Sequence, residues 1–393
     1  MSDRLRIVVL GGMAQMPYAG VAWQLLHYLE GFRRLGHDVV YIEDTETWPY
    51  DPEQASLGDE AGPGVRRIER ILSAHGFGER WAYRDVARDG EVSGMTAERF
   101  DATLAHADVL INVSAMTVLS ERHLRVPVRV YLETDPVMPQ LEIFLGEQAT
   151  IESLAAHTVH FSFGERLGRP GCRLPVERFD YRPTRQPVVL DWWRPPEEFP
   201  QPPAGEPRFT TIANWEQTHR DVEWEGESYT WSKSHEFRKL LDVPRRAGVV
   251  FDAALSLDDA ETIAELEDHG WHVRDADPLS RDLEAYREFI RGSAAEFSAA
   301  KDQNVRLRTG WFSDRSATYL ASGRPVVVQD TGFDVALPVG EGLLAFRTPD
   351  EAVTALEAVA ADYPRHSRAA RDVAAECFDA ERVCARLLEE ALA

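Results

Sequence analysis

The chain has 393 residues, with 66 acidic and 43 basic side chains and a formal net charge of −23. This charge argues against a nucleic-acid backbone or an anionic membrane as the main partner, because both are themselves negatively charged. The length exceeds what one hydrophobic core usually supports, so we expect two domains. No apolar run approaches the ~20 residues needed to cross a bilayer.

The cysteines and the first residues indicate a reducing compartment. The chain begins with an expected strand at residues 5–10 in place of a signal peptide. Three cysteines, Cys172, Cys377 and Cys384, have no metal-ligand spacing. We therefore expect a cytoplasmic protein. A homodimer is left open, because the sequence does not determine the oligomeric state.

Short apolar runs alternate with helical patterns along the first half of the chain. Such runs are typical of buried parallel strands, and their alternation with helices predicts a doubly wound α/β sheet. The expected strands are residues 6–10, 38–42, 109–113, 128–132 and 158–161.

The loop after the first strand, residues 11–20, is rich in glycine but lacks the GxGxxG pattern of dinucleotide-binding proteins. A dehydrogenase is therefore a poor fit. We expect this loop and the next polar strand end to form a pocket for an acceptor molecule, although Tyr18 could equally well pack the loop. The predicted acceptor-binding residues are Gly12, Met13, Gln15, Tyr18 and Glu133.

Proline recurs between residues 194 and 207, and few apolar residues accompany it. We interpret this segment as an interdomain linker. The first domain is then residues 1–193, the second is 208–375, and a closing helix at 376–393 could pack back on the first domain.

The second half repeats the strand and helix pattern and predicts a second Rossmann-like sheet. No sequence repeat relates the halves, and residues 220–229 indicate an inserted hairpin. The expected strands are residues 209–213, 249–253, 271–274, 296–298, 325–328 and 343–346.

The segment 309–333 is the most informative part of the chain. Gly310 and Ser313 precede an expected helix at 314–322, and a helix start presents unpaired N–H groups and partial positive charge to an anion. The strand at 325–328 ends where open parallel sheets bind ligands. We expect the segment to hold a diphosphate through Gly310, Trp311, Ser313, Asp314, Arg315, Ser316, Asp330, Thr331 and Gly332.

An ordinary alternative exists for these residues, since Ser313 and Asp314 could merely cap a helix and Asp330 could merely form a turn. A second anion site is suggested elsewhere in the second half. Lys233 precedes an expected helix at 235–241 and Lys301 opens a polar run, although lysines are usually solvated. The additional donor-site candidates are Asn214, Trp215, Lys233, Glu296 and Lys301.

The two Rossmann-like halves, the glycine-rich first loop, the proline linker and the block GW-x-S…SGRPVV-x-QD resemble the two-domain GT-B glycosyltransferases. The likeness covers nearly the whole chain. YLETDP, HFSFGERLG and KDQNVRLRTGWFSDRSATYLASGRPVV are similar to a bacterial branch of that superfamily. The resemblance implies two sheets facing a cleft, with a nucleotide-sugar on the second domain and the acceptor on the first.

Residues 310–313 resemble the GWNS block of that superfamily. Gly310 and Trp311 match its first two residues, Phe312 stands in place of its Asn, and Ser313 matches its phosphate-binding Ser. Ser316 stands where the block supplies a Glu to the ribose hydroxyls. The resemblance therefore implies a pyrophosphate site that lacks its usual ribose contact. Glu296 could replace that contact, and Gln329 with Asp330 would meet the sugar hydroxyls.

We expect transfer with inversion, because GW-x-S resembles the pattern of inverting enzymes more closely, and retention is the alternative. Inversion needs a base, because an alcohol is a weak nucleophile that must lose its proton. Related enzymes use a His after the first strand, but residues 11–20 contain none, and we interpret His27 as a core residue. Asp135 ends the strand at 128–132 and is the predicted base, with a simple turn before Pro136 as the alternative.

The sequence thus predicts a glycosyltransferase that moves a sugar from a nucleoside-diphosphate sugar, such as UDP-glucose, to a hydroxyl of a small acceptor such as a natural product or nucleoside. We expect neither a metal nor another cofactor, because helix N-termini and Lys233 would carry the diphosphate charge. A nucleotide-sugar epimerase and a non-catalytic nucleotide-binding homologue remain alternatives.

Overall fold

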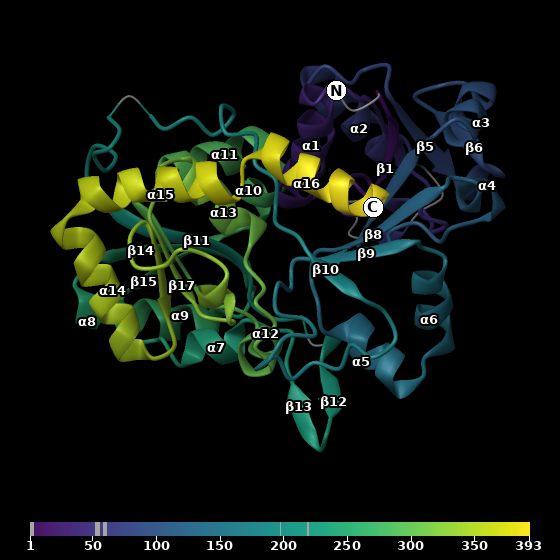
Figure 1. The fold of residues 1–393 in the computed structure, drawn as a ribbon. Coiled ribbons are helices and arrows are strands. Elements are labelled where there is room, and N and C mark those ends of the chain that lie inside the picture. The colour runs from purple at the N-terminus through teal and green to yellow at the C-terminus, as the bar shows by residue number, and fades with distance from the viewer. Residues whose placement is uncertain (1–3, 52–55, 58–60, 197, 218–219) are drawn as a thin grey trace.

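The computed structural model describes residues 4–51, 56–57, 61–196, 198–217 and 220–393 (Figure 1). It places the chain in two α/β halves, each built on one large sheet. No helix in these residues is both long and apolar enough to cross a membrane.

The described residues of the first half form an eight-stranded sheet whose strands are β1 Arg6–Leu10, β2 Asp38–Glu43, β5 Trp81–Asp85, β6 Glu91–Ser93, β7 Val109–Val113, β8 Val128–Glu133, β9 Val159–Ser162 and β10 Tyr181–Pro183. Their order in space is β10-β9-β8-β7-β1-β2-β5-β6, and only the β5 and β6 pair is antiparallel. The reversal at β1, between β2 and β7, opens a crevice at the carboxyl ends of the strands.

The second half contains a six-stranded parallel sheet in the part of the chain that is described. Its strands are β11 Arg208–Asn214, β14 Val250–Ser256, β15 Trp271–Asp275, β16 Ala295–Ser298, β17 Val326–Gln329 and β18 Leu343–Phe346. Their order is β15-β14-β11-β16-β17-β18, which places β11 and β16 side by side. Two small antiparallel pairs join β3 Tyr50–Asp51 to β4 Ser56–Leu57 and β12 Val222–Trp224 to β13 Glu227–Tyr229.

Helices cover both sheets (Figure 1). Those of the first half are α1 Ala19–Arg34, α2 Gly62–Ala74, α3 Ala97–Ala105, α4 Glu121–Leu124, α5 Met138–Leu145 and α6 Gln148–Ala155. Those of the second half are α7 Ser234–Arg238, α8 Val243–Ala247, α9 Ala260–Asp268, α10 Asp277–Arg281, α11 Leu283–Arg291, α12 Asp302–Leu307, α13 Asp314–Ala321, α14 Pro349–Ala361, α15 Tyr363–Cys377 and α16 Ala380–Leu392.

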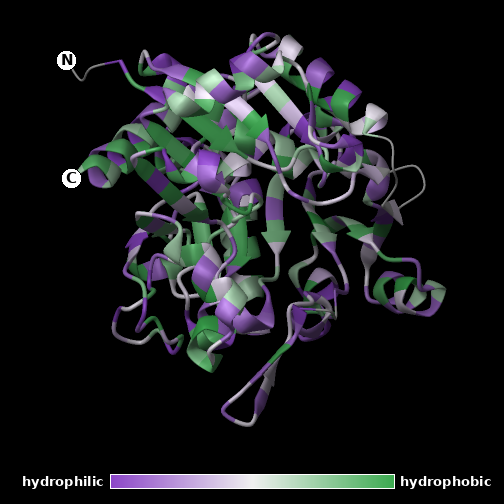
Figure 2. Ribbon diagram, turned by 90° about the vertical axis from the view of Figure 1, so that its right-hand side faces the viewer, coloured by the Kyte–Doolittle hydropathy of each residue, from purple (hydrophilic) through white to green (hydrophobic). Residues whose placement is uncertain are grey.

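Hydrophobic residues concentrate on the strands, and the hairpin β12–β13 extends away from the body of the molecule (Figures 1 and 2). β7 and β17 are buried along their whole length, which explains their continuous apolar sequences. Every strand predicted from an apolar run is present, with ends shifted by up to three residues. The helix predicted at 235–241 is shorter in the structure, where α7 ends at Arg238. A separate helix, α8, follows, with Pro244 in its first turn.

The last helix returns to the first half of the chain. α16, yellow in Figure 1, packs against α1, and the backbone of Val188 exchanges hydrogen bonds with Phe378 and Ala380. Gly31 on α1 makes this close approach possible. A Cβ atom there would lie 2.6 Å from the Cys384 Sγ atom and 3.1 Å from the Ala380 carbonyl oxygen.

We therefore expect Gly31→Ala to lower the stability of the fold by ~1–3 kcal/mol, the usual cost of overpacking, despite the better helix propensity of alanine. Gly20→Ala on the same helix is the matched control, since its nearest neighbour, the Tyr286 hydroxyl, would lie 3.7 Å away. Thermal and urea unfolding measure both variants. Equal stability of the two would contradict the close packing of α16 on α1.

Candidate functional site

The carboxyl ends of the two sheets face each other across a cavity of about 330 Å³, which we call the crevice. Residues after β8 and around the start of α1 form one wall, and residues after β11, β16 and before α13 form the other. The crevice is lined by Tyr18, Gly20, Val21, Asp135, Ile212, Ala213, Asn214, Gln217, Trp231, Ser232, Lys233, Ser280, Tyr286, Lys301, Ser313, Asp314 and Arg315.

The N-terminus of α13 lies in the wall of the crevice. Ser313 is the N-cap residue in an extended conformation, and its own side chain makes no capping hydrogen bond. The first N–H groups of a helix lack partners within the helix and carry partial positive charge. This wall is therefore suited to an anion, as the sequence predicts for Ser313.

Lys233 and Lys301 line the crevice. The chain has only one other lysine, Lys239. Lys233 is 9% exposed, and its Nζ atom donates to the Ser298 hydroxyl at 3.4 Å. Burial lowers the pKa of Lys233 well below its usual range, and the neighbouring Arg315 guanidinium adds to the effect. A bound anion would favour the charged amine, so this position is prepared for a negative ligand.

Lys301 lies between the two halves of the molecule. Its Nζ atom is 3.2 Å from the centre of the Trp231 ring and 5.9 Å from that of Trp311, and it pairs with the Asp135 carboxylate of the first half. Burial lowers the pKa of Lys301, whereas Asp135 opposes the shift. The pair satisfies both charges at the interface.

A smaller cavity of about 190 Å³, here called the side cavity, adjoins the crevice on the side of the first half. Asp135 and Asp314 line both spaces. Burial raises the pKa of Asp314, and the nearby Asp135 charge adds to this. The two carboxylates thus stand at the passage between the spaces. The side cavity is otherwise lined by Gly11, Gly12, Met16, Val21, Gln24, Leu25, Val113, Ser114, Met116, Thr134 and Trp311.

The loop before α13 is also fastened to the first half. The Trp311 indole donates to the Thr134 carbonyl at 2.9 Å, and Arg166 N donates to the Thr309 carbonyl at 3.0 Å. Gly310 has a φ of +77°, and a Cβ atom there would lie 2.9 Å from the Arg166 backbone nitrogen. Glycine at this position therefore permits the close approach of the two halves.

The predicted donor residues fall into three groups. The first lies outside the lining of the crevice: Glu296 is 0% exposed and pairs with Arg315 at 2.7 Å, and Asp330 pairs with Arg308 and Arg347. Trp215 belongs to this group too, because it packs in the core. Gly332 likewise lies outside, with a φ of +102°. Asn214, Lys233, Lys301, Ser313, Asp314 and Arg315 line the crevice, while Trp311, Ser316 and Thr331 line a narrow space beside it.

The predicted acceptor residues divide in the same way. Glu133 is buried and accepts hydrogen bonds from Ser162, Gln140 and Tyr131, so it faces the core and not an acceptor. Met13 is also a core residue, and Gln15 contributes its backbone N–H to Glu43. Gly12 and Tyr18 do line the two spaces. Tyr286 and Gln217 line the crevice although no sequence motif marks them.

No protein-family model matches the chain, and no curated protein sequence matches it. Solved structures do match over nearly its full length. The alpha-glucosyltransferase AGT in complex with UDP is 12% identical, with a TM-score of 0.57 and coverage of 99% of this chain and 100% of that one. Another structure of an alpha-glucosyltransferase holds UDP and a 13-mer DNA.

Two further structures match over nearly the full length of the chain. AviGT4, a glycosyltransferase involved in avilamycin A biosynthesis, is 14% identical, with a TM-score of 0.52 and coverage of 98% and 97%. HepE of Anabaena, in complex with UDP and glucose, is 10% identical, with a TM-score of 0.53 and coverage of 98% and 99%. Structural similarity at such low sequence identity shows the fold alone. It confirms the predicted GT-B architecture of two Rossmann-like domains.

The buried Glu133 makes stability depend on pH. Burial raises its pKa from 4.5 to about 7, although hydrogen bonds from Ser162, Gln140 and Tyr131 oppose the shift. Between these two values the folded chain keeps a proton that the unfolded chain releases, so this group makes stability fall as pH rises. We expect a shallower fall in Glu133→Gln than in wild type or in the exposed control Glu357→Gln, measured by thermal unfolding. Parallel curves would contradict the raised pKa.

Proposed function

We propose that this protein is a glycosyltransferase that moves a sugar from a uridine-diphosphate sugar to a hydroxyl group of a small acceptor. The observation that carries this proposal is the crevice of a GT-B fold, where the N-terminus of α13 and the buried Lys233 face Asp135 of the opposite half. The N-terminus of α13 and Lys233 would bind an anion, and Asp135 would accept a proton.

The donor diphosphate would lie against Ser313 and Lys233. The N–H groups at the start of α13 and the Lys233 ammonium would stabilise the charge that develops on the leaving diphosphate. Because these groups supply positive charge, the transfer itself would need no metal. Uridine is proposed as the nucleoside because UDP is present in the AGT and HepE structures of the same fold.

Asp135 would accept the proton of the acceptor hydroxyl. In this step the acceptor oxygen bonds to the anomeric carbon, the bond from that carbon to the diphosphate oxygen breaks, and the proton passes to the carboxylate. Such a displacement inverts the anomeric configuration. Asp135 Oδ1 supports this role, since it is buried and has no hydrogen-bond partner among the described residues.

Asp314 would contact the donor sugar. Its carboxylate lines both the crevice and the side cavity, and no side chain in the described residues forms an ion pair with it. The Asp314 carboxylate can thus accept hydrogen bonds from the sugar, which must lie between the diphosphate and the acceptor molecule. This assigns to Asp314 the role that the sequence suggested for Asp330.

The acceptor would be a small molecule, such as a natural product or a nucleoside, in the side cavity. That cavity combines apolar side chains, among them Met16, Leu25 and Met116, with the polar Ser114 and Thr134. Small-molecule sites commonly combine a mainly apolar lining with a few polar groups. DNA is present in three alpha-glucosyltransferase structures of the same fold, but a net charge of −23 disfavours a polyanion here.

Titration calorimetry with UDP, GDP, ADP and TDP tests the donor site. We expect UDP to bind, and Lys233→Met to weaken its binding roughly 10- to 100-fold, in line with ~1.5–3 kcal/mol for a hydrogen bond to a charged group. Lys239→Met is the matched control, because this lysine is half exposed and lies outside the crevice. Wild-type affinity for UDP in Lys233→Met would refute the assignment.

Two readouts separate the candidate functions: release of UDP from UDP-sugars and conversion of the donor sugar itself, each measured with and without a panel of hydroxylated acceptors. A transferase needs an acceptor to form its product, an epimerase converts the donor alone, and a pure binding protein turns over neither. A product whose anomeric configuration is opposite to that of the donor would support a base at Asp135, and a retained configuration would contradict it.

Asp135→Asn is expected to slow transfer by ~10²–10⁴-fold, the usual contribution of a general base, while UDP binding stays within a few-fold of wild type. The variant also leaves Lys301 without its carboxylate. The double variant Asp135→Asn/Lys301→Met distinguishes the two effects. Recovery of the rate in the double variant would show that the unpaired lysine, and not the missing base, caused the loss.

A further inference from the structure

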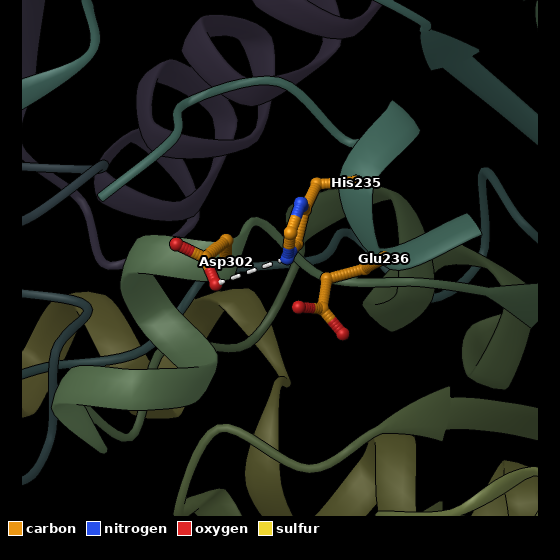
Figure 3. A group of neighbouring side chains, drawn as sticks. All are labelled: His235, Glu236 and Asp302. Atoms are coloured by element: carbon orange, nitrogen blue, oxygen red, sulfur yellow. Dashed lines mark ion pairs between the residues drawn. The ribbon is translucent and has the colours of Figure 1, made fainter. Parts of the chain in front are cut away.

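Beside the crevice, three side chains that can bind a metal converge on one point (Figure 3). His235 and Glu236 lie on α7, and Asp302 is the first residue of α12. One nitrogen or oxygen atom from each lies within 4.8 Å of the others. The transfer proposed above uses none of these side chains.

Asp302 carries an unsatisfied atom that points to a ligand. The residue is 1% exposed, and its Oδ2 atom accepts from Thr230 N at 3.1 Å and from Arg306 at 3.2 Å. Its Oδ1 atom is buried and has no hydrogen-bond partner among the described residues, an arrangement that is costly for a carboxylate. This atom is directed at the His235 imidazole (Figure 3).

The distance between these two atoms fits a shared cation better than a direct contact. Asp302 Oδ1 lies 3.9 Å from His235 Nε2, which is too long for a hydrogen bond. Two ligands of one zinc ion, each bonded at about 2.0–2.2 Å, are separated by roughly 3–4 Å. Ligand atoms at the 4.8 Å limit of the cluster would need to approach one another by roughly 1–2 Å to share such an ion.

We propose that His235, Glu236 and Asp302 bind one divalent cation, with zinc as the ion that best fits one imidazole and two carboxylates. Two carboxylates balance the charge of the ion, and water would complete its coordination. The His235 side chain is 52% exposed, so the ion can enter from solvent and the imidazole can turn toward it.

Two basic side chains, those of Lys239 and Arg306, pair with the carboxylates of the cluster in the absence of zinc. Lys239 Nζ lies 2.5 Å from Glu236 Oε1, and Arg306 bonds Asp302. Their side chains are 51% and 32% exposed, so both can turn toward solvent when a divalent ion replaces them. Gln329 also donates to Glu236 Oε2, and that bond can remain because a carboxylate oxygen has two lone pairs.

The site would hold the crevice in shape without taking part in transfer. Lys233 and Lys301 are the N-cap residues of α7 and α12, the two helices that supply the ligands. Glu236 also holds Gln329 at the end of β17. A cation here would therefore join the segments that carry both crevice lysines.

Calorimetric titration of the chelator-treated, full-length protein with zinc chloride tests the proposal. We expect one zinc per chain, a raised midpoint of thermal unfolding on binding, and loss of both in His235→Ala and in Asp302→Asn. His269→Ala is the matched control, because His269 also faces a carboxylate, Asp242 Oδ1 at 2.7 Å, but lies outside the cluster.

The visible spectrum of added cobalt(II) identifies the ligands independently of stability. We expect absorption bands of a protein-bound ion in wild type and in His269→Ala, and their loss in a folded His235→Ala protein, as judged by circular dichroism. Failure of the wild type to bind zinc, or equal binding by wild type and His235→Ala, would overturn the proposal.

Discussion

The geometry of the crevice depends on one ion pair, in which Lys301 of the second half meets Asp135 of the first. Removing either charge from water costs several kcal/mol unless the partner is present, so each residue holds the other in place. The Trp231 ring provides further stabilisation for the ammonium through its face. The pair lines the same cavity as Ser313 and Lys233, which are the proposed contacts of the diphosphate.

The two halves are joined by contacts of two different kinds. Trp311 and Arg166 make polar contacts where the loop before α13 meets the first half. α16 makes an apolar contact with α1 at a different place, through residues such as Cys384. Helix α1 also packs against α10, α11 and α13 of the second half. One apolar cluster therefore includes residues of both halves, such as Trp23 and Tyr286.

Local sequence was sufficient for most strands, because a buried parallel strand is a continuous apolar run that needs no information from the rest of the chain. It also placed Asn214, Ser313 and Asp135 at strand and helix ends, which meet at one edge in this fold. It gave no sign that arginines from distant segments pair with Glu296 and Asp330. Such pairings depend on tertiary structure. Tyr286 was missed for the same reason, because only the packing of α11 brings it to the crevice.

The scarcity of lysine has a practical consequence for chemistry on this protein. Two of its three lysines line the crevice, and the third, Lys239, is half exposed. Burial lowers the pKa of Lys233, which makes its amine more nucleophilic than that of an exposed lysine at the same pH. A small amine-selective reagent would therefore modify few positions, and most of those would report on the crevice. Covalent labelling followed by mass measurement could thus distinguish the free protein from one whose crevice holds an anion.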